Sequence, residues 1–282
     1  MSEIYPFLFF LQNHALYFRN QDSVLGILSR NPENDFGKIS RELISLDPEF
    51  LLEIQNGKYK SCNPFKEDKG IHRVRYGEGI YPCDFKYLID PPLVFSYMGS
   101  PIWFAEKISV VGSRDPSQKS IWWMSQELKR ILSSSALVSV SGGAIGVDQI
   151  AHQTSIELNL PTIAILPSGL KCLYPQRFSR YVESIIKNKG CILSEFQDDQ
   201  NVFKHHFSFR NRLIAALGKV SVIVEAREKS GTLITAHRAL EMGKDVFVVP
   251  GHPLDDNFKG SLSLLKLGAH ILTEAQDIDY WL

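Results

Sequence analysis

The spacing of apolar residues changes along the chain near residue 76. Before that point, apolar positions recur at helical intervals and are separated by polar connectors around residues 31–34 and 63–64. This pattern predicts a small helical N-terminal domain over residues 1–76. The helical spacing is clearest at Leu43, Ile44, Leu46, Phe50, Leu51 and Ile54.

From about residue 77 onward, short apolar runs alternate with longer amphipathic segments. The runs do not alternate apolar with polar positions, which is typical of parallel strands covered by helices on both faces. The predicted fold is therefore α/β, with an extended Rossmann-like, doubly wound and mostly parallel sheet over residues 77–282. The runs occupy residues 108–111, 137–140, 162–166, 220–224 and 246–249.

The amphipathic segments between these runs predict the helices that cover the sheet. Only residues 250–282 follow the last run, so no further folded domain is expected at the C-terminus. The predicted helices span residues 118–133, 147–158, 177–188, 210–217, 232–242 and 261–267.

Composition narrows the class of protein without indicating a function. The 282 residues are 44% hydrophobic and 22% charged, which excludes collagen-like and disordered chains. Lys and Arg number 31, as do Asp and Glu, so net charge gives no argument for a nucleic-acid partner. The four cysteines form no C-x-x-C pair, and no apolar stretch reaches the roughly 18 to 20 residues of a membrane span. A soluble, cytoplasmic protein with reduced thiols and no membrane partner is therefore expected.

Residues that follow the predicted strands carry the candidate chemistry, because ligands of open α/β sheets bind beyond the carboxyl ends of the strands. After the run at 108–111, residues 112–114 (GSR) combine a flexible turn, a hydroxyl and a guanidinium. After the run at 137–140, the glycine-rich stretch 141–148 opens a helix whose free N–H groups and dipole favour an anion.

A second small-residue loop follows the run at 220–224. It contains Arg227 and Lys229 and ends in residues 230–232 (SGT), again directly before a predicted helix. If the sheet is wound as predicted, two helix N-termini and Arg114 converge on one crevice. We expect a site for several consecutive phosphates there.

Cofactor and metal sites are disfavoured by the same residues. A dinucleotide site requires G-x-G-x-x-G with an acidic residue about 20 positions later, whereas Gly142, Gly143 and Gly146 have a different spacing and no carboxylate ends the next strand. No G-K-[ST] follows a glycine-rich turn, which excludes a P-loop. His205 and His206 lack further ligands at a metal-binding spacing. Neither a cofactor nor a metal is expected.

Positive charge is concentrated between residues 201 and 238, which contain seven Lys or Arg residues and only two Glu residues. Within this stretch, residues 204–212 (KHHFSFRNR) interleave cations with aromatic rings. Cations that follow phosphates and rings that stack on unpaired bases are what a single-stranded nucleic acid site requires.

At these residues the sequence resembles the DNA processing protein A family, abbreviated DprA and also called Smf. The resemblance extends from about residue 81 to residue 271 and keeps the order and spacing of the family's sequence blocks. The blocks are VGSR at 111–114, SGGAIGVDQIAH at 141–152, SGLKCLYP at 168–175, LSE at 193–195, FRNRLIAAL at 209–217, VEAREKSGTLITAHRALEMGKDVFVVPG at 224–251 and GSLSLLKLGAH at 260–270.

The resemblance implies an extended Rossmann fold that binds single-stranded DNA without base specificity, forms a homodimer and helps to load the RecA recombinase in natural transformation. It implies protection and hand-over of a strand with no catalytic step, so the protein is expected not to be an enzyme. The implied DNA contacts are Arg114, Lys204, Phe207, Arg210 and Arg212, with loop amides from Gly142, Gly143, Ser230, Gly231 and Thr232; Lys171 and Lys229 are added as cations near the crevice.

The chain also departs from the family pattern. Lys119-Ser120 stand where relatives often have Tyr-Gly, and Lys171 stands where they often have Asp. Some relatives carry a C-terminal winged-helix domain, which is not expected here. The four leucines that would form a dimer face, or else pack under the sheet, are Leu262, Leu264, Leu265 and Leu267.

Other interpretations stay open. Asp148, Glu195 and Glu225 could form an acid/base set in a Rossmann-like nucleotide-processing enzyme of the phosphoribohydrolase type, although charged residues replace the glycine pair before residues 230–232. A nucleotide sensor that acts through the helical domain is a third interpretation. Arg212 could instead belong to a structural ion pair at a helix start.

Overall fold

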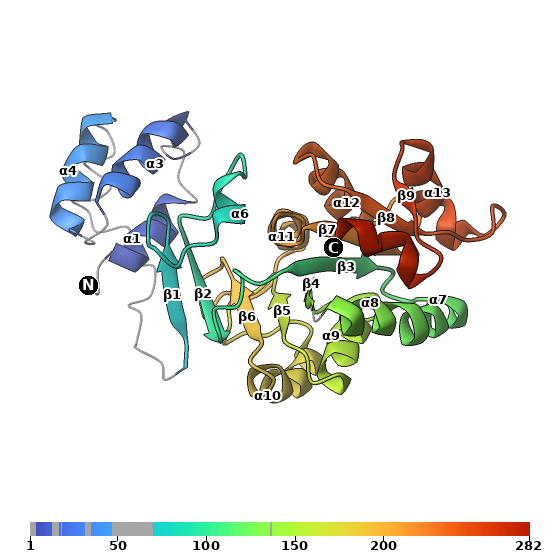
Figure 1. Cartoon of the computed structure of the whole chain (residues 1–282). Helices are drawn as coiled ribbons and strands as arrows, with labels where there is room; N and C mark the ends of the chain where they lie inside the picture. Colours follow the sequence, from blue (N-terminus) through green and yellow to red (C-terminus); the bar gives the residue numbers. More distant parts are fainter. Residues whose placement is uncertain (1–3, 13–16, 18, 32–34, 47–69, 136) are drawn as a thin grey trace.

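Nine strands form a single sheet that runs through most of the chain (Figure 1). The computed structural model describes residues 4–12, 17, 19–31, 35–46, 70–135 and 137–282, and every element below lies in those ranges. Across the sheet the strand order is β1-β2-β6-β5-β4-β3-β7-β8-β9. The strands are β1 (His72–Arg75), β2 (Val94–Gly99), β3 (Lys107–Gly112), β4 (Val138–Ser141), β5 (Thr162–Ile165), β6 (Cys191–Ser194), β7 (Val220–Val224), β8 (Val246–Val249) and β9 (His270–Ile271).

The predicted fold class is confirmed by the centre of this sheet. β3, β4, β5, β7 and β8 coincide with the five predicted runs, and all of their pairings are parallel. β3 lies between β4 and β7, so the chain order reverses at β3. In a doubly wound sheet this reversal is the point at which two strand ends diverge and leave room for a ligand.

Helices cover both faces of the sheet, which explains why the strand runs are apolar throughout. In Figure 1, α11, α12 and α13 lie on one side of the sheet and α7, α8, α9 and α10 on the other. The helices are α1 (Ile4–Leu11), α3 (Gln21–Arg30), α4 (Phe36–Leu46), α6 (Cys83–Lys86), α7 (Gln118–Trp123), α8 (Lys129–Ser135), α9 (Val147–Glu157), α10 (Ser179–Lys187), α11 (Lys204–Leu217), α12 (Gly231–Glu241) and α13 (Lys259–Lys266). A π-helical turn, Met124–Leu128, joins α7 to α8.

One predicted helix begins much earlier than expected. The spacing of apolar residues placed its start at Arg210, whereas α11 begins at Lys204. Phe203 precedes the helix and its side chain makes no capping hydrogen bond, so no capping residue marks this start in the sequence. The cationic and aromatic residues of the 204–212 segment therefore lie on a helix.

Four strands were not predicted, namely β1, β2, β6 and β9, and the first of them lies before the predicted domain boundary. β1 lies inside the segment predicted as helical and pairs antiparallel with β2, with Val74 opposite Phe95. β2 in turn pairs antiparallel with β6. The sheet therefore begins at His72, before the predicted boundary at residue 76. With the sequence HRVR, β1 is too short and too charged to be distinguished as a strand.

The N-terminal helices pack against the β1–β2 edge of the sheet. Their apolar side chains form a separate core to which Leu93 and Val94, at the start of β2, also contribute. Phe50, Leu51 and Ile54 of the predicted helical pattern lie outside the described residues. Among the helices of the described ranges, none is long and apolar enough to cross a bilayer.

Candidate functional site

A cleft of about 890 Å³ opens beside the carboxyl ends of β3 and β7. Its walls come from the loop after β3, the first half of α11, the start of α12 and the glycine-rich loop before α9. This is the position that the strand reversal at β3 predicts. The volume lies within the range of roughly 300 to 1,000 Å³ that is usual for small-molecule sites.

Seven of the twelve predicted site residues line this cleft, although they come from distant parts of the sequence. The other five, Gly142, Gly143, Lys171, Arg212 and Lys229, do not. Asn211 and His205 line it without having been predicted, because the start of α11 was placed too late. The predicted residues in the cleft are Arg114, Lys204, Phe207, Arg210, Ser230, Gly231 and Thr232.

Arg114 and two aromatic rings form a row next to the cleft. The guanidinium carbon of Arg114 lies 4.8 Å from the centre of the Phe207 ring. The Tyr174 ring meets Phe207 edge to face at 5.7 Å. Arg114 and Tyr174 are exposed and Phe207 is half-buried. A cation beside aromatic faces can bind phosphates and stack on unpaired bases.

The start of α12 is fixed against α11 and β3 by two hydrogen bonds. Thr232 Oγ1 donates to the Gly112 carbonyl at 2.9 Å, and Asn211 Nδ2 donates to the Gly231 carbonyl at 3.1 Å. The side chain of Ser230 precedes the helix without capping it. The helix dipole adds to the positive charge of Arg114, Lys204 and Arg227 in the cleft.

Arg210 lies inside the protein, which corrects the prediction that it reaches out to DNA. Its side chain donates from Nη1 to the Gly142 carbonyl at 2.6 Å and also to the Ile165 carbonyl. Only 3% of the residue is exposed, and burial lowers the pKa of its guanidinium to about 10. Arg210 therefore supports the glycine-rich loop from below.

The glycine-rich loop also differs from the predicted phosphate cradle. The amides of Gly142 and Ala144 donate to Asp148 Oδ2 at 3.2 and 3.3 Å, so Asp148 already occupies them. Gly142 is required for another reason, because a Cβ there would lie 2.0 Å from Arg210 Nη1. Gly143 is buried and has a φ of +72°, in the left-handed region that favours glycine. The two glycines serve packing and turn geometry.

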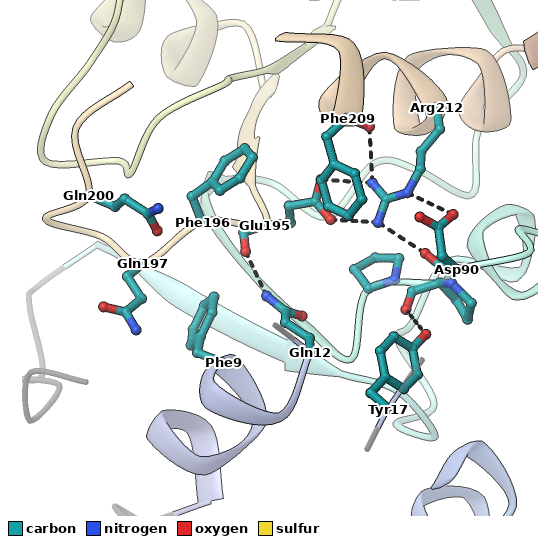
Figure 2. A pocket seen from close by; sticks show the side chains of 12 residues that line it. Phe9, Gln12, Tyr17, Asp90, Glu195, Phe196, Gln197, Gln200, Phe209 and Arg212 are labelled. Carbon is teal, nitrogen blue, oxygen red and sulfur yellow. Dashed lines mark hydrogen bonds and ion pairs between the residues drawn. The ribbon is translucent and has the colours of Figure 1, made fainter. Parts of the chain in front are cut away.

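Arg212 is a structural residue, as one of the open interpretations allowed. Figure 2 shows it extending from α11 toward Glu195 and Asp90. Nη1 and Nη2 donate to the two carboxylate oxygens of Glu195, each at 2.7 Å, and Nε lies 3.0 Å from Asp90 Oδ1. The guanidinium also stacks on the Phe209 ring at 3.9 Å. Arg212 is 4% exposed and cannot contact DNA in this position.

Two hydrogen bonds to backbone carbonyls near this ion pair connect the N-terminal segment to the rest of the protein. Gln12 Nε2 donates to the Glu195 carbonyl at 2.9 Å, and Tyr17 donates its hydroxyl proton to the Pro91 carbonyl at 2.8 Å (Figure 2). These residues surround a small pocket of about 20 Å³, which is enough for one water molecule at the roughly 10 to 15 Å³ that a water requires. Sequence elements that are far apart thus meet around Arg212.

The proposed acid/base set does not assemble. Glu195 is held by Arg212 and Asp148 by the loop amides, whereas Glu225 alone lines the cleft with a carboxylate oxygen that is not engaged.

The two predicted lysines, Lys171 and Lys229, are exposed outside the cleft wall. Lys171 lies next to the Asp198 backbone, and Lys229 precedes α12. Among the described residues, no group of three or more His, Cys, Asp or Glu could hold a metal ion.

A buried histidine below the loop provides a pH test. His152 Nδ1 lies 2.7 Å from Thr162 Oγ1, and burial lowers its pKa to about 3. In the unfolded chain, His152 binds a proton below about pH 6.5, whereas in the folded protein it stays neutral. Stability should therefore fall as the pH drops from 6.5 toward 3. We expect His152 to cost the wild type about 2 kcal/mol of unfolding free energy between pH 7 and pH 5, and His152→Gln should not show this decrease.

Urea unfolding of the wild type and of His152→Gln at pH 7 and at pH 5 tests this prediction. His237→Gln is the matched control, because His237 is exposed on α12. Equal pH slopes for the wild type and His152→Gln would contradict the prediction.

The fold and the site together define a class: a Rossmann-like α/β protein with a basic, aromatic-lined cleft at its strand reversal. The family model described as DNA recombination-mediator protein A matches residues 72–280. The chain belongs to this family, that of DprA and Smf. Its members are proteins of DNA processing and recombination.

Individual relatives support the assignment. The chain is 36% identical over 199 residues to DNA processing protein DprA of Streptococcus pneumoniae, which covers 70% of each protein. It is 33% identical over 213 residues to DprA of Bacillus subtilis, covering 75% of this chain and 71% of that protein.

Two solved structures are similar to this fold. The X-ray structure of DprA from Streptococcus pneumoniae has a TM-score of 0.81 at 28% identity and covers 99% of this chain and 97% of that one. The structure of DprA from Helicobacter pylori has a TM-score of 0.65 at 31% identity, with coverage of 74% and 93%.

Proposed function

We propose that this protein binds single-stranded DNA in the cleft between α11 and α12, without base specificity and without catalysis. The single observation that carries the proposal is the row of Arg114, Phe207 and Tyr174 beside a cleft with further cations. Phosphates would contact Arg114, Lys204 and the start of α12, and unpaired bases would stack on the rings. The relative from Helicobacter pylori, whose structure concerns a single-stranded DNA binding mode, supports the proposal.

We further propose that the protein hands the bound strand to the RecA recombinase and acts as a homodimer. The description of the family as recombination mediators supports the first part. For the second, Leu267 on the predicted leucine face is 66% exposed, whereas Leu264 is buried. Faster RecA assembly on pre-bound DNA would support the first part, and a dimer mass in sedimentation would support the second.

Replacing Arg114 by alanine tests the main proposal. The variant should bind fluorescently labelled oligothymidylate about tenfold more weakly at 0.15 M salt, and its log–log salt slope should decrease by about 0.7 as one phosphate contact is lost. The measurement is a fluorescence anisotropy titration at several salt concentrations.

Arg180→Ala is a matched control. Arg180 is also exposed and also lies over an aromatic ring, that of Tyr181 at 4.7 Å, but it is not part of the cleft wall. It should bind DNA like the wild type. Unchanged affinity and salt slope of Arg114→Ala would contradict the proposal.

The nucleotide-processing alternative is favoured only by Glu225, the single acidic residue of the proposed set that faces the cleft with an unengaged oxygen. Incubation with nucleoside monophosphates distinguishes the two functions. A non-catalytic binder releases no free base, and release that depends on Glu225 would contradict our proposal.

A further inference from the structure

Glu225 stands at the point where the chain leaves β7 for the cleft. Its φ is +58°, which is uncommon for a residue other than glycine. The side chain is fully buried, and Oε2 accepts hydrogen bonds from Ser117 N at 2.8 Å and Ser120 Oγ at 2.7 Å. One carboxylate oxygen is therefore fixed, and the orientation of the other is determined.

That other oxygen, Oε1, has no hydrogen-bond partner among the described residues. Two further buried atoms of cleft residues share this property within the described ranges, Ser230 Oγ and Arg210 Nε. A buried polar atom without a partner is costly, and a charged one more so. Of these, Glu225 Oε1 is an acceptor and Ser230 Oγ a hydroxyl in residues of the cleft wall, whereas Arg210 lies beneath the glycine-rich loop.

The chemistry of the ligand follows from the acceptor. The phosphodiester backbone of DNA carries acceptors only, and a deoxyribose inside a strand has no free hydroxyl. The donors of a DNA strand are the N–H groups of its bases and the hydroxyls at its ends. A base edge carries both donors and acceptors, and every nucleotide of the strand has one, whereas free hydroxyls occur only at the two strand ends. A base edge therefore matches Glu225 and Ser230 at any position along a strand.

We propose that one unpaired base enters the cleft and donates an N–H of its Watson–Crick edge to Glu225 Oε1. This inference rests on the proposed function. All four bases have such an N–H, so the contact is compatible with binding that ignores sequence. In a duplex the same edge is occupied by the complementary strand, so Glu225 makes the cleft selective for unpaired DNA.

The test combines one protein variant with one chemical change in the DNA. In Glu225→Gln the amide oxygen can replace Oε2 next to Ser117 and Ser120, which turns an NH2 group toward the cleft in place of an acceptor. Methylation of thymine at N3 removes the only N–H of that base and leaves the phosphates and the ring in place. Oligothymidylate and its N3-methylated form are titrated against both proteins.

The wild type should bind the methylated strand about tenfold more weakly, as expected for loss of one hydrogen bond to a charged group. Glu225→Gln should bind the unmodified strand about tenfold more weakly and should be nearly insensitive to methylation. An oligothymidylate with a phosphorylated 3′ end should bind the wild type as well as the unmodified strand does.

Several outcomes would overturn the inference. One is equal wild-type affinity for both strands, which needs no variant and is unaffected by folding. Another is the same methylation loss in Glu225→Gln, which would indicate a steric effect. A loss on 3′ phosphorylation alone would assign Glu225 to a strand end. If Arg114→Ala binds oligothymidylate as tightly as the wild type does, the proposed function is contradicted. If Arg114→Ala binds weakly but methylation has no effect on the wild type, only the inference about Glu225 is contradicted.

Discussion

Replacing Arg212 by alanine is expected to lower the free energy of unfolding by about 3 to 5 kcal/mol, the usual cost of leaving one member of a buried ion pair alone. Glu195 would remain without its partner in a site where its carboxylate is almost fully buried, and burial raises the pKa of this carboxyl. Burial opposes the charge on Arg212, but Glu195 and Asp90 outweigh it and raise the pKa of the guanidinium. Replacing Arg212 therefore leaves the Glu195 carboxyl buried without its partner, and urea unfolding measures the loss.

Arg130→Ala is the matched control for this variant. Arg130 pairs with Glu127 at 2.8 Å, but its side chain is 64% exposed. Exposed pairs contribute at most about 1 kcal/mol. The prediction would be contradicted if Arg212→Ala were as stable as Arg130→Ala but had lost its DNA affinity. Arg212 would then contact DNA, as predicted from the family resemblance.

Gly142→Ala should have the second largest effect, because the new methyl group would occupy the position of the Arg210 guanidinium. The ideal Cβ lies 2.0 Å from Nη1 and 2.5 Å from the central carbon of that group. Displacing Arg210 breaks its bonds to the Gly142 and Ile165 carbonyls and leaves a buried charge without them. We expect a loss of about 3 kcal/mol in unfolding free energy and weaker DNA binding, since the loop borders the cleft.

Gly231→Ala provides the comparison for this loop variant. Gly231 lines the cleft, yet a Cβ there meets no atom within 4 Å. Its substitution should change stability by no more than about 0.5 kcal/mol. If both glycine variants unfold at the same urea concentration, the support of the loop by Arg210 is not significant for stability.

Much of the cleft could be predicted from local sequence. Arg114 and the residues 230–232 follow apolar runs directly, and parallel strands place such loops at one edge of the sheet. Lys204 and Phe207 were found because cations and rings alternate in that segment. These inferences needed only neighbouring residues and the handedness of βαβ units.

The roles of the two arginines on α11 could not be predicted in the same way. Arg210 and Arg212 are two positions apart and look alike in sequence, but their partners are Ile165 and Gly142 for one and Glu195 and Asp90 for the other. Burial depends on what packs over a helix, and these partners come from other strands and loops. The early start of α11 was missed because no capping residue precedes the helix, and β1 was missed because its four residues form no apolar run.

The sequence by itself determined the doubly wound sheet, the family and the edge at which the cleft opens, because apolar periodicity and loop composition are local properties. Only the tertiary structure separated the residues that face the cleft from those that support it. Asp148 and Glu195 are held by internal partners, whereas Glu225 keeps one buried oxygen unengaged among the described residues. Which carboxylate oxygens have partners is decided by contacts across the fold, and these contacts have no signature in the order of residues.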